Sequence, residues 1–210
     1  MKKLKFIAIL SGLFFVATSC SKNDPTPETD QEEVGTATLT FTEVERESHG
    51  DHFHYNDIKN PEVEIIKFSG TNLLPAVGSH AHLELGKTYR LTLTATDFAG
   101  RETQQTFVQR ADIHQAFLIG APEGSLTYVY ADKDADGKNV QVGVTGYITV
   151  DKIIDKPFLL RYIIRHLNPG VKAKITAADW NNVNFAQFTG ENDLDLKAEL
   201  HLVQAGHDHD

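Results

Sequence analysis

Histidine is concentrated in a few short stretches of this chain, and the spacing points to metal binding. The sequence holds ten histidines among 210 residues. His49, His52 and His54 fall within six residues, and His80 and His82 are separated by a single alanine. Imidazole is a good ligand for Zn²⁺, Cu²⁺ and Ni²⁺. These five histidines are therefore our candidate metal ligands.

The His-x-His spacing suits an ion held on one face of a strand. Side chains two residues apart in a strand share a face and lie about 6.6–6.8 Å apart along the chain, so both rings can turn toward one ion. Gly50 lets the first cluster bend, and Asp51 adds a carboxylate. Zn²⁺ takes about four N, O or S ligands. We expect Zn²⁺, with Cu²⁺ and Ni²⁺ as alternatives, in a site that joins both clusters if they lie at the same end of the fold.

The other five histidines are given a lesser role. His207 and His209 alternate with aspartates in the last four residues and are expected to bind metal weakly, as a flexible arm. His114, His166 and His201 are isolated in the sequence, and we expect each to be a structural polar residue. His201 stands between two leucines and should therefore face away from the core.

An acidic segment invites comparison with a calcium loop. Asp132, Asp134, Asp136 and Gly137 match positions 1, 3, 5 and 6 of that loop. Position 12, which needs a bidentate glutamate, is Gly143. We therefore disfavour Ca²⁺ and expect an acidic hairpin turn between two strands.

The N-terminus carries the features of an export signal. Three lysines by residue 5 precede an apolar stretch, Phe6–Val16, and the small residues Ala17–Ser19 lead to Cys20. This pattern resembles the lipobox of bacterial lipoproteins, with alanine at the position usually held by leucine. The resemblance implies removal of residues 1–19, lipidation of Cys20 and anchoring at the bacterial outer membrane, facing either the periplasm or the cell surface.

Composition excludes several classes of function. Cys20 is the only cysteine and Met1 the only methionine, so internal disulfides, thiolate catalysis and cysteine-based metal sites are ruled out. The net charge is −9, and loss of the three signal lysines makes the mature chain more acidic. An acidic surface of this kind is unsuited to nucleic acid.

The remaining sequence reads as a tether, one β domain and a short tail. Residues 20–35 are polar and acidic, residues 36–204 show strand-like alternation, and residues 205–210 form a His/Asp-rich tail. We predict an all-β fold, an antiparallel, immunoglobulin-like β-sandwich with little helix, and keep two β units divided near residue 111 as an alternative. One short helix is expected at Thr176–Val183, with Thr176 and Asp179 as its capping residues. Alternation predicts strands at 36–42, 63–65, 82–85, 89–96, 126–130, 140–144, 147–150, 158–164 and 194–202.

A family resemblance adds a biological setting. Residues 19–24, the sandwich-like alternation and the acidic hairpin at 130–137 resemble the small β-sandwich lipoproteins of Bacteroidota. Members of that group often stand near TonB-dependent receptors, which implies nutrient capture beside an outer-membrane transporter. We expect a lipoprotein that binds a transition metal for acquisition or sequestration. The alternative is an adhesive module that binds a glycan or another protein, and an enzyme is disfavoured because no catalytic motif is present.

Overall fold

The computed structural model describes residues 34–206. Cys20, the expected signal peptide, most of the expected tether and the tail histidines His207 and His209 lie outside the described residues. No helix among residues 34–206 has the length and apolar character needed to cross a membrane.

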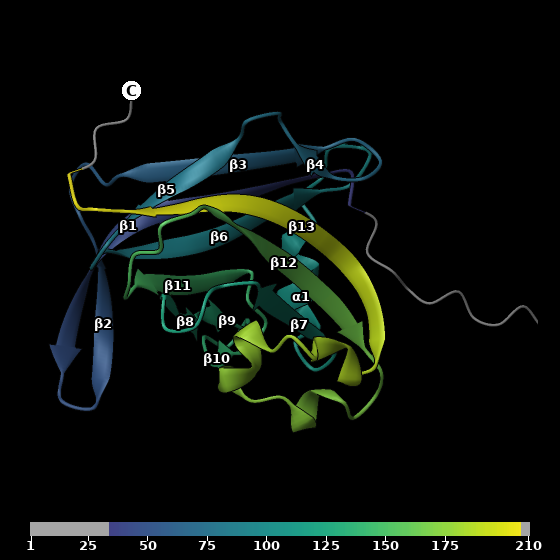
Figure 1. The fold of residues 1–210 in the computed structure, drawn as a ribbon. Coiled ribbons are helices and arrows are strands. Elements are labelled where there is room, and N and C mark those ends of the chain that lie inside the picture. Colours follow the sequence, from purple (N-terminus) through teal and green to yellow (C-terminus); the bar gives the residue numbers. More distant parts are fainter. Residues whose placement is uncertain (1–33, 207–210) are drawn as a thin grey trace, which may run out of the picture. The chain divides into compact units, whose positions relative to one another are not determined.

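Two β-sheets pack face to face (Figure 1). The first has the strand order β4-β3-β1-β6-β11-β8, with β2 paired to part of β1. The second has the order β5-β13-β12-β7, and a third pairing joins β9 to β10. The strands are β1 (Thr36–His49), β2 (His52–Asp57), β3 (Val63–Ser69), β4 (Leu74–Pro75), β5 (His80–Glu84), β6 (Thr88–Thr96), β7 (His114–Ile119), β8 (Leu126–Tyr130), β9 (Asp132–Lys133), β10 (Asn139–Val140), β11 (Thr145–Val150), β12 (Phe158–Leu167) and β13 (Gly190–Val203).

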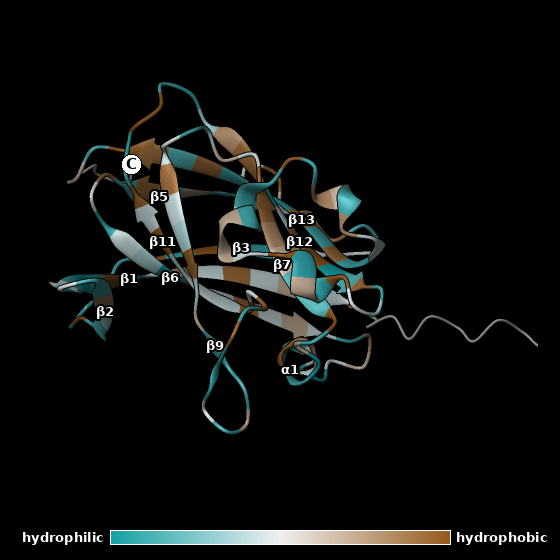
Figure 2. Ribbon diagram, turned by 90° about the horizontal axis from the view of Figure 1, so that it is seen from below, coloured by the Kyte–Doolittle hydropathy of each residue, from teal (hydrophilic) through white to brown (hydrophobic). Residues whose placement is uncertain are grey.

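Alternation along the strands builds the core between the sheets. In β6 the side chains of Leu91, Leu93 and Ala95 are buried while the threonines between them are partly exposed. Leu194 to Leu202 repeat the pattern at every second residue of β13. Each leucine buried in this way contributes about 1.5–3 kcal/mol to stability. Figure 2 shows the resulting bands of apolar and polar residues along the strands. The predicted all-β sandwich is confirmed, and its pairing is antiparallel except between β5 and β13.

Strands from both sides of residue 111 share both sheets. β6 pairs with β11 in the first sheet, and β5 pairs with β13 in the second. The chain therefore crosses from one sheet to the other both before and after residue 111, the boundary considered for two β units.

Helical segments are short and lie at the edges of the sandwich. The predicted helix is a 3-10 helix, η2 (Ala177–Asn181), and the carboxylate of Asp179 accepts hydrogen bonds from the amide and hydroxyl of Thr176. The other segments are α1 (Gln104–Gln109), η1 (Lys172–Lys174) and η3 (Phe185–Gln187). Phe117, Leu167, Val171 and Phe188 form a second, smaller apolar cluster beside η1 and η3.

The acidic segment is a hairpin, as expected from its turn chemistry. β9 and β10 pair antiparallel, and Asp134 Oδ1 accepts the amides of Asp136 and Lys138 to close the turn. Asp132 points inward and accepts the amides of Gly143 and Thr145 at 2.5 and 2.7 Å. Burial raises the pKa of Asp132 even though these two donors favour its charge. The Asp134 carboxylate thus holds the turn between β9 and β10, and the Asp132 carboxylate holds the backbone that leads from β10 into β11.

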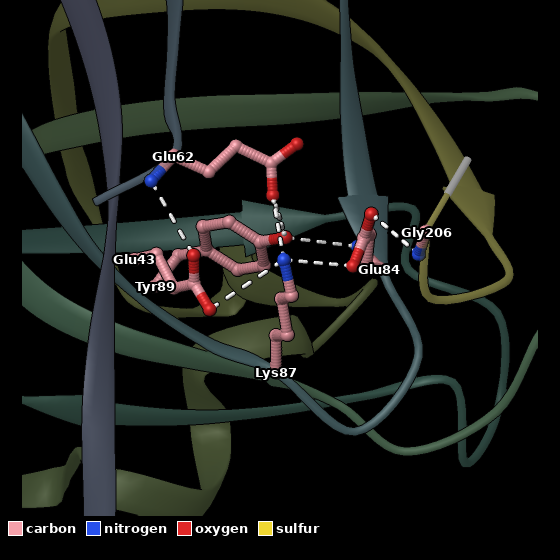
Figure 3. A network of polar contacts seen from close by, with 6 residues as sticks. All are labelled: Glu43, Glu62, Glu84, Lys87, Tyr89 and Gly206. Atoms are coloured by element: carbon pink, nitrogen blue, oxygen red, sulfur yellow. Dashed lines mark hydrogen bonds and ion pairs between the residues drawn. The ribbon is translucent and has the colours of Figure 1, made fainter. Parts of the chain in front are cut away.

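One lysine connects the two sheets at an end of the sandwich (Figure 3). The amine of Lys87 lies 2.7 Å from Glu84 at the end of β5, 3.1 Å from Glu62 before β3 and 3.5 Å from Glu43 on β1. Glu84 is almost fully buried, with its side chain 6% exposed. A single cation therefore lies within ion-pair distance of three carboxylates that come from both sheets.

Further hydrogen bonds complete this network. The hydroxyl of Tyr89 donates to Glu62 and accepts the amide of Glu84, while the amide of Gly206 donates to the Glu84 carboxylate. Burial opposes the charge on Lys87, but its bonds to the glutamates outweigh burial and hold the pKa of the amine above its ordinary value. The network thereby attaches the chain just after β13 to the end of β5.

Replacing Lys87 with methionine should destabilise the protein by about 3 kcal/mol, the lower end of the range for removing one partner of a buried ion pair, since Lys87 is partly exposed. The loss should shrink at about pH 4, where protonation relieves the unpaired carboxylates. Urea unfolding of Lys87→Met measures both effects. Lys67→Met, at an exposed position of β3, is the control and should stay within about 0.5 kcal/mol of the parent. Equal stability of the two variants would contradict the assigned role of the network.

Candidate metal centre

Three histidines meet where β5 runs beside β13. β5 is an edge strand, and its parallel pairing places His82 opposite His201 and His80 opposite Glu199. Ala81, Leu200 and Leu202 alternate with these residues and are buried in the core. The histidines therefore lie together on the outer face of the second sheet, since the strand period of two directs the intervening residues inward.

The three imidazole rings are in mutual contact. Ring centroids lie 4.8 Å apart for His80 and His82, 4.5 Å for His80 and His201, and 5.0 Å for His82 and His201. One nitrogen from each ring can be chosen so that all three lie within 4.8 Å of one another. Donor atoms around one tetrahedral zinc ion lie roughly 3.4 Å apart, so the rings would turn inward to share an ion.

Neighbouring acceptors fix the orientation of two of the rings. His80 Nδ1 donates to the carbonyl of Gly78 at 2.8 Å, and His201 Nε2 donates to Glu199 Oε1 at 2.8 Å. Because both partners can only accept, the proton sits on the ring nitrogen in each bond. His80 Nε2 and His201 Nδ1 are left with lone pairs. Metal-binding histidines in proteins commonly have such an acceptor on the opposite nitrogen.

The chemistry open to this group is that of a three-imidazole site at the surface. His80 is exposed, and His82 and His201 are half-buried. Three neutral nitrogens suit Zn²⁺, Cu²⁺ or Ni²⁺ and leave a coordination position for water or an incoming ligand. No family model, curated protein or solved structure matches this chain. The case for a metal centre is therefore made by the donor set and its geometry.

The histidines of the first sequence cluster lie elsewhere. His49 ends β1, and His52 and His54 lie on β2, so the expected His-rich loop is a hairpin that extends from the first sheet (Figure 1). The Nε2 atoms of His52 and His54 are 3.1 Å apart, whereas His49 Nε2 lies 3.4 Å from Glu47. Among the described residues, the donor group that includes His80 contains no hairpin histidine.

The hairpin escaped prediction because it lacks the periodic pattern of a half-buried strand. His52-Phe53-His54-Tyr55 alternates for only four residues, and five of the six residues in β2 are exposed, so neither face is buried as in a core strand. Its support comes from aromatic contacts: the rings of Tyr55 and Tyr147 stack 3.8 Å apart, and Arg46 lies over Phe53. The hydrogen bond from His52 lowers the pKa of Asp51 at the exposed tip.

A second donor group contains residues that the sequence did not single out. His114 on β7, His166 on β12 and Asp193 on β13 place donor atoms within 4.8 Å of one another. His114, His166 and His201, which we expected to be single structural residues, therefore each lie beside other possible metal ligands. Isolated positions in the sequence gave no sign of these contacts, because cross-strand pairing brings them together.

Loss of the tyrosine stack should loosen the hairpin without unfolding the sandwich. Tyr55→Ala should speed amide hydrogen exchange across residues 52–57, because stacking of Tyr55 on Tyr147 holds β2 against the sheet. Tyr55→Phe keeps the stacked ring and should retain the parent exchange rates. If Tyr55→Ala leaves exchange in β2 unchanged, the stack does not position the hairpin.

Proposed function

We propose that this chain is a lipid-anchored, extracytoplasmic protein that binds Zn²⁺ reversibly through His80, His82 and His201. The observation that carries the proposal is the convergence of three imidazoles on two neighbouring strands, two of them oriented by acceptors on their far nitrogens. The hairpin pair His52 and His54 supplies an additional, more exposed place for weak binding.

Several features favour exchange over permanent retention of the metal. The group lies on the outer face of an edge strand, and all three rings are at least partly accessible to solvent. Three protein ligands leave one position of a tetrahedral shell open, where a donor from another molecule can enter. A site of this type can accept an ion and pass it on, which suits acquisition or sequestration.

The sequence favours a location at the bacterial outer membrane, where reversible binding of a metal ion is useful. The lipobox-like segment ending at Cys20 favours attachment to the outer membrane of a bacterium. The excess of acidic over basic residues favours attraction of cations to the surface. We propose an outer-membrane transporter as the partner that receives the ion or supplies it.

Alanine at His82 and His201 should abolish the tight, reversible Zn²⁺ binding at this group. The test uses the full chain in detergent, with no affinity tag and with serine at His207 and His209. This parent should bind Zn²⁺ with a Kd below about 1 μM. His82→Ala/His201→Ala should weaken binding by more than the roughly 10–100-fold expected for loss of an outer contact.

The matched control is His52→Ala/His54→Ala, which should retain the tight site. Affinity in the parent should also fall as the solution is acidified, because protons compete with the metal for imidazole lone pairs. Isothermal titration measures all of these affinities. Equal loss in the two double variants would contradict the proposed site, and absence of binding in the parent would favour a glycan- or protein-binding module.

The carboxylate that orients His201 should tune the affinity. Glu199→Gln keeps the size of the side chain but removes the charge that accepts the His201 proton. We expect Zn²⁺ binding to weaken by about tenfold, at the low end of the effect of outer-shell partners. Glu191→Gln, at an exposed position of the same strand, should leave the affinity unchanged. The same titration distinguishes the two variants.

A further inference from the structure

The second donor group is buried, and its polar atoms lack hydrogen-bond partners. The side chains of His114 and Asp193 are fully buried, and that of His166 is 13% exposed. His114 Nε2, His166 Nδ1 and both carboxylate oxygens of Asp193 have no hydrogen bond. Burial of a carboxylate without a hydrogen-bond partner costs several kcal/mol. The two carboxylate oxygens and the two ring nitrogens gathered here therefore need an explanation.

A break in strand register brings Asp193 to this place. Ile164 pairs with Leu194 and Arg165 pairs with Asn192, which leaves Asp193 without a partner. The residues after it alternate, with Leu194 buried and Asp195 partly exposed. A bulge re-aims the side chain of its extra residue. Here it buries a carboxylate that the regular pattern would direct toward solvent.

The hydrogen bonds around His114 determine which of its nitrogens carries a proton. His114 Nδ1 lies 3.0 Å from the carbonyl oxygen of Arg110, which can only accept, so Nδ1 donates. In the neutral ring Nε2 then has a lone pair, and it faces Asp193 Oδ2 at 3.2 Å. His166 Nδ1 lies 3.7 Å from the same oxygen, beyond hydrogen-bond range. With a neutral His114, a nitrogen lone pair and a carboxylate oxygen therefore face each other with no hydrogen bond between them.

We infer that His114, His166 and Asp193 form a second metal site, which holds a divalent transition-metal ion of the zinc class inside the fold. The distances fit this assignment: donor atoms around a tetrahedral ion at about 2.0–2.1 Å are roughly 3.4 Å apart, close to the observed 3.2 and 3.7 Å. Two imidazoles, one of them backed by a carbonyl, and one carboxylate are a common set of ligands for such ions.

The surroundings of the group hold its members rigidly. Arg165 donates to the carbonyls of Phe188 and Gly190 and to Asn192 Oδ1, and so fixes the chain that leads into the bulge. The amine of Lys172 donates to the carbonyl of His114. The ring of Phe107 stands edge-on to His114 with centroids 5.2 Å apart and covers it from the core.

Gly190 permits the close approach of β12 and β13 beside this group. Its φ of +151° is unfavourable for other residues, and a Cβ there would collide with the carbonyl oxygen of His166. The backbone that carries His166 is therefore packed directly against the start of β13. Such crowding limits how far the donors can separate when no ion is bound.

The two sites differ in what they do. The ion held by His114, His166 and Asp193 connects three strands of the second sheet, β7, β12 and β13, and is shielded from solvent. Binding to the folded state alone adds to the free energy of unfolding. The buried ion is therefore structural and exchanges slowly, whereas the outer-face site loads and unloads.

The test uses the full chain in detergent with outer-face and tail donors removed: His80→Ala, His201→Ala, His207→Ser and His209→Ser. This parent is refolded with Zn²⁺ and dialysed against EDTA, and its zinc is measured by elemental analysis. We expect one zinc to be retained per chain and a lower unfolding midpoint after refolding without metal. Refolding with Co²⁺ should give the visible absorption bands of a protein-bound ion of low coordination number.

Asp193→Asn in the same parent should lose the zinc and the cobalt bands, whereas Asp195→Asn on the outer face should keep both. If Asp193→Asn does not fold, the zinc content and cobalt spectrum of the parent still decide the matter. A parent that folds, retains no zinc and has the same unfolding midpoint with and without metal would overturn the inference. Because the parent lacks the outer-face donors, this result is independent of the reversible site.

Discussion

The register of β13 is the constraint on which both donor groups depend. Its parallel pairing with β5 sets His201 against His82, and its antiparallel pairing with β12 brings Asp193 toward His166. A shift of one residue in either register would turn the donor toward the opposite face, because side chains alternate along a strand. The leucines buried at every second position of β13 prevent that shift.

Polar networks secure this strand near both ends. Lys87 and its glutamates attach Gly206 to the end of β5. At the start of β13, Arg165 on β12 donates hydrogen bonds to the carbonyl of Phe188 and to the side chain of Asn192. In both places a cation bridges segments that are distant in the sequence, and the apolar pattern fixes the register between them. Electrostatic contacts thus hold the two ends of β13 in place, and burial of its apolar side chains fixes the register of its middle.

Sequence alone could predict the fold class but only part of the donor sets. Alternation of apolar and polar residues identified most long strands, because each has one buried face. It missed the exposed β2, where both faces meet solvent. His80 and His82 were found because they are neighbours in the sequence. His201, His114, His166 and Asp193 could not be assigned, since strand pairing and an irregular register bring them to their partners.

β13 follows every other strand of the described residues, and this order determines when the two donor groups can form. His82 and His201 are 119 residues apart, and His114 and Asp193 are 79 residues apart. Neither donor group exists until the last strand has been made and has joined the second sheet. A chain synthesised only as far as β12 therefore has scattered histidines but no complete donor set, so the proposed ion binding has to wait for β13.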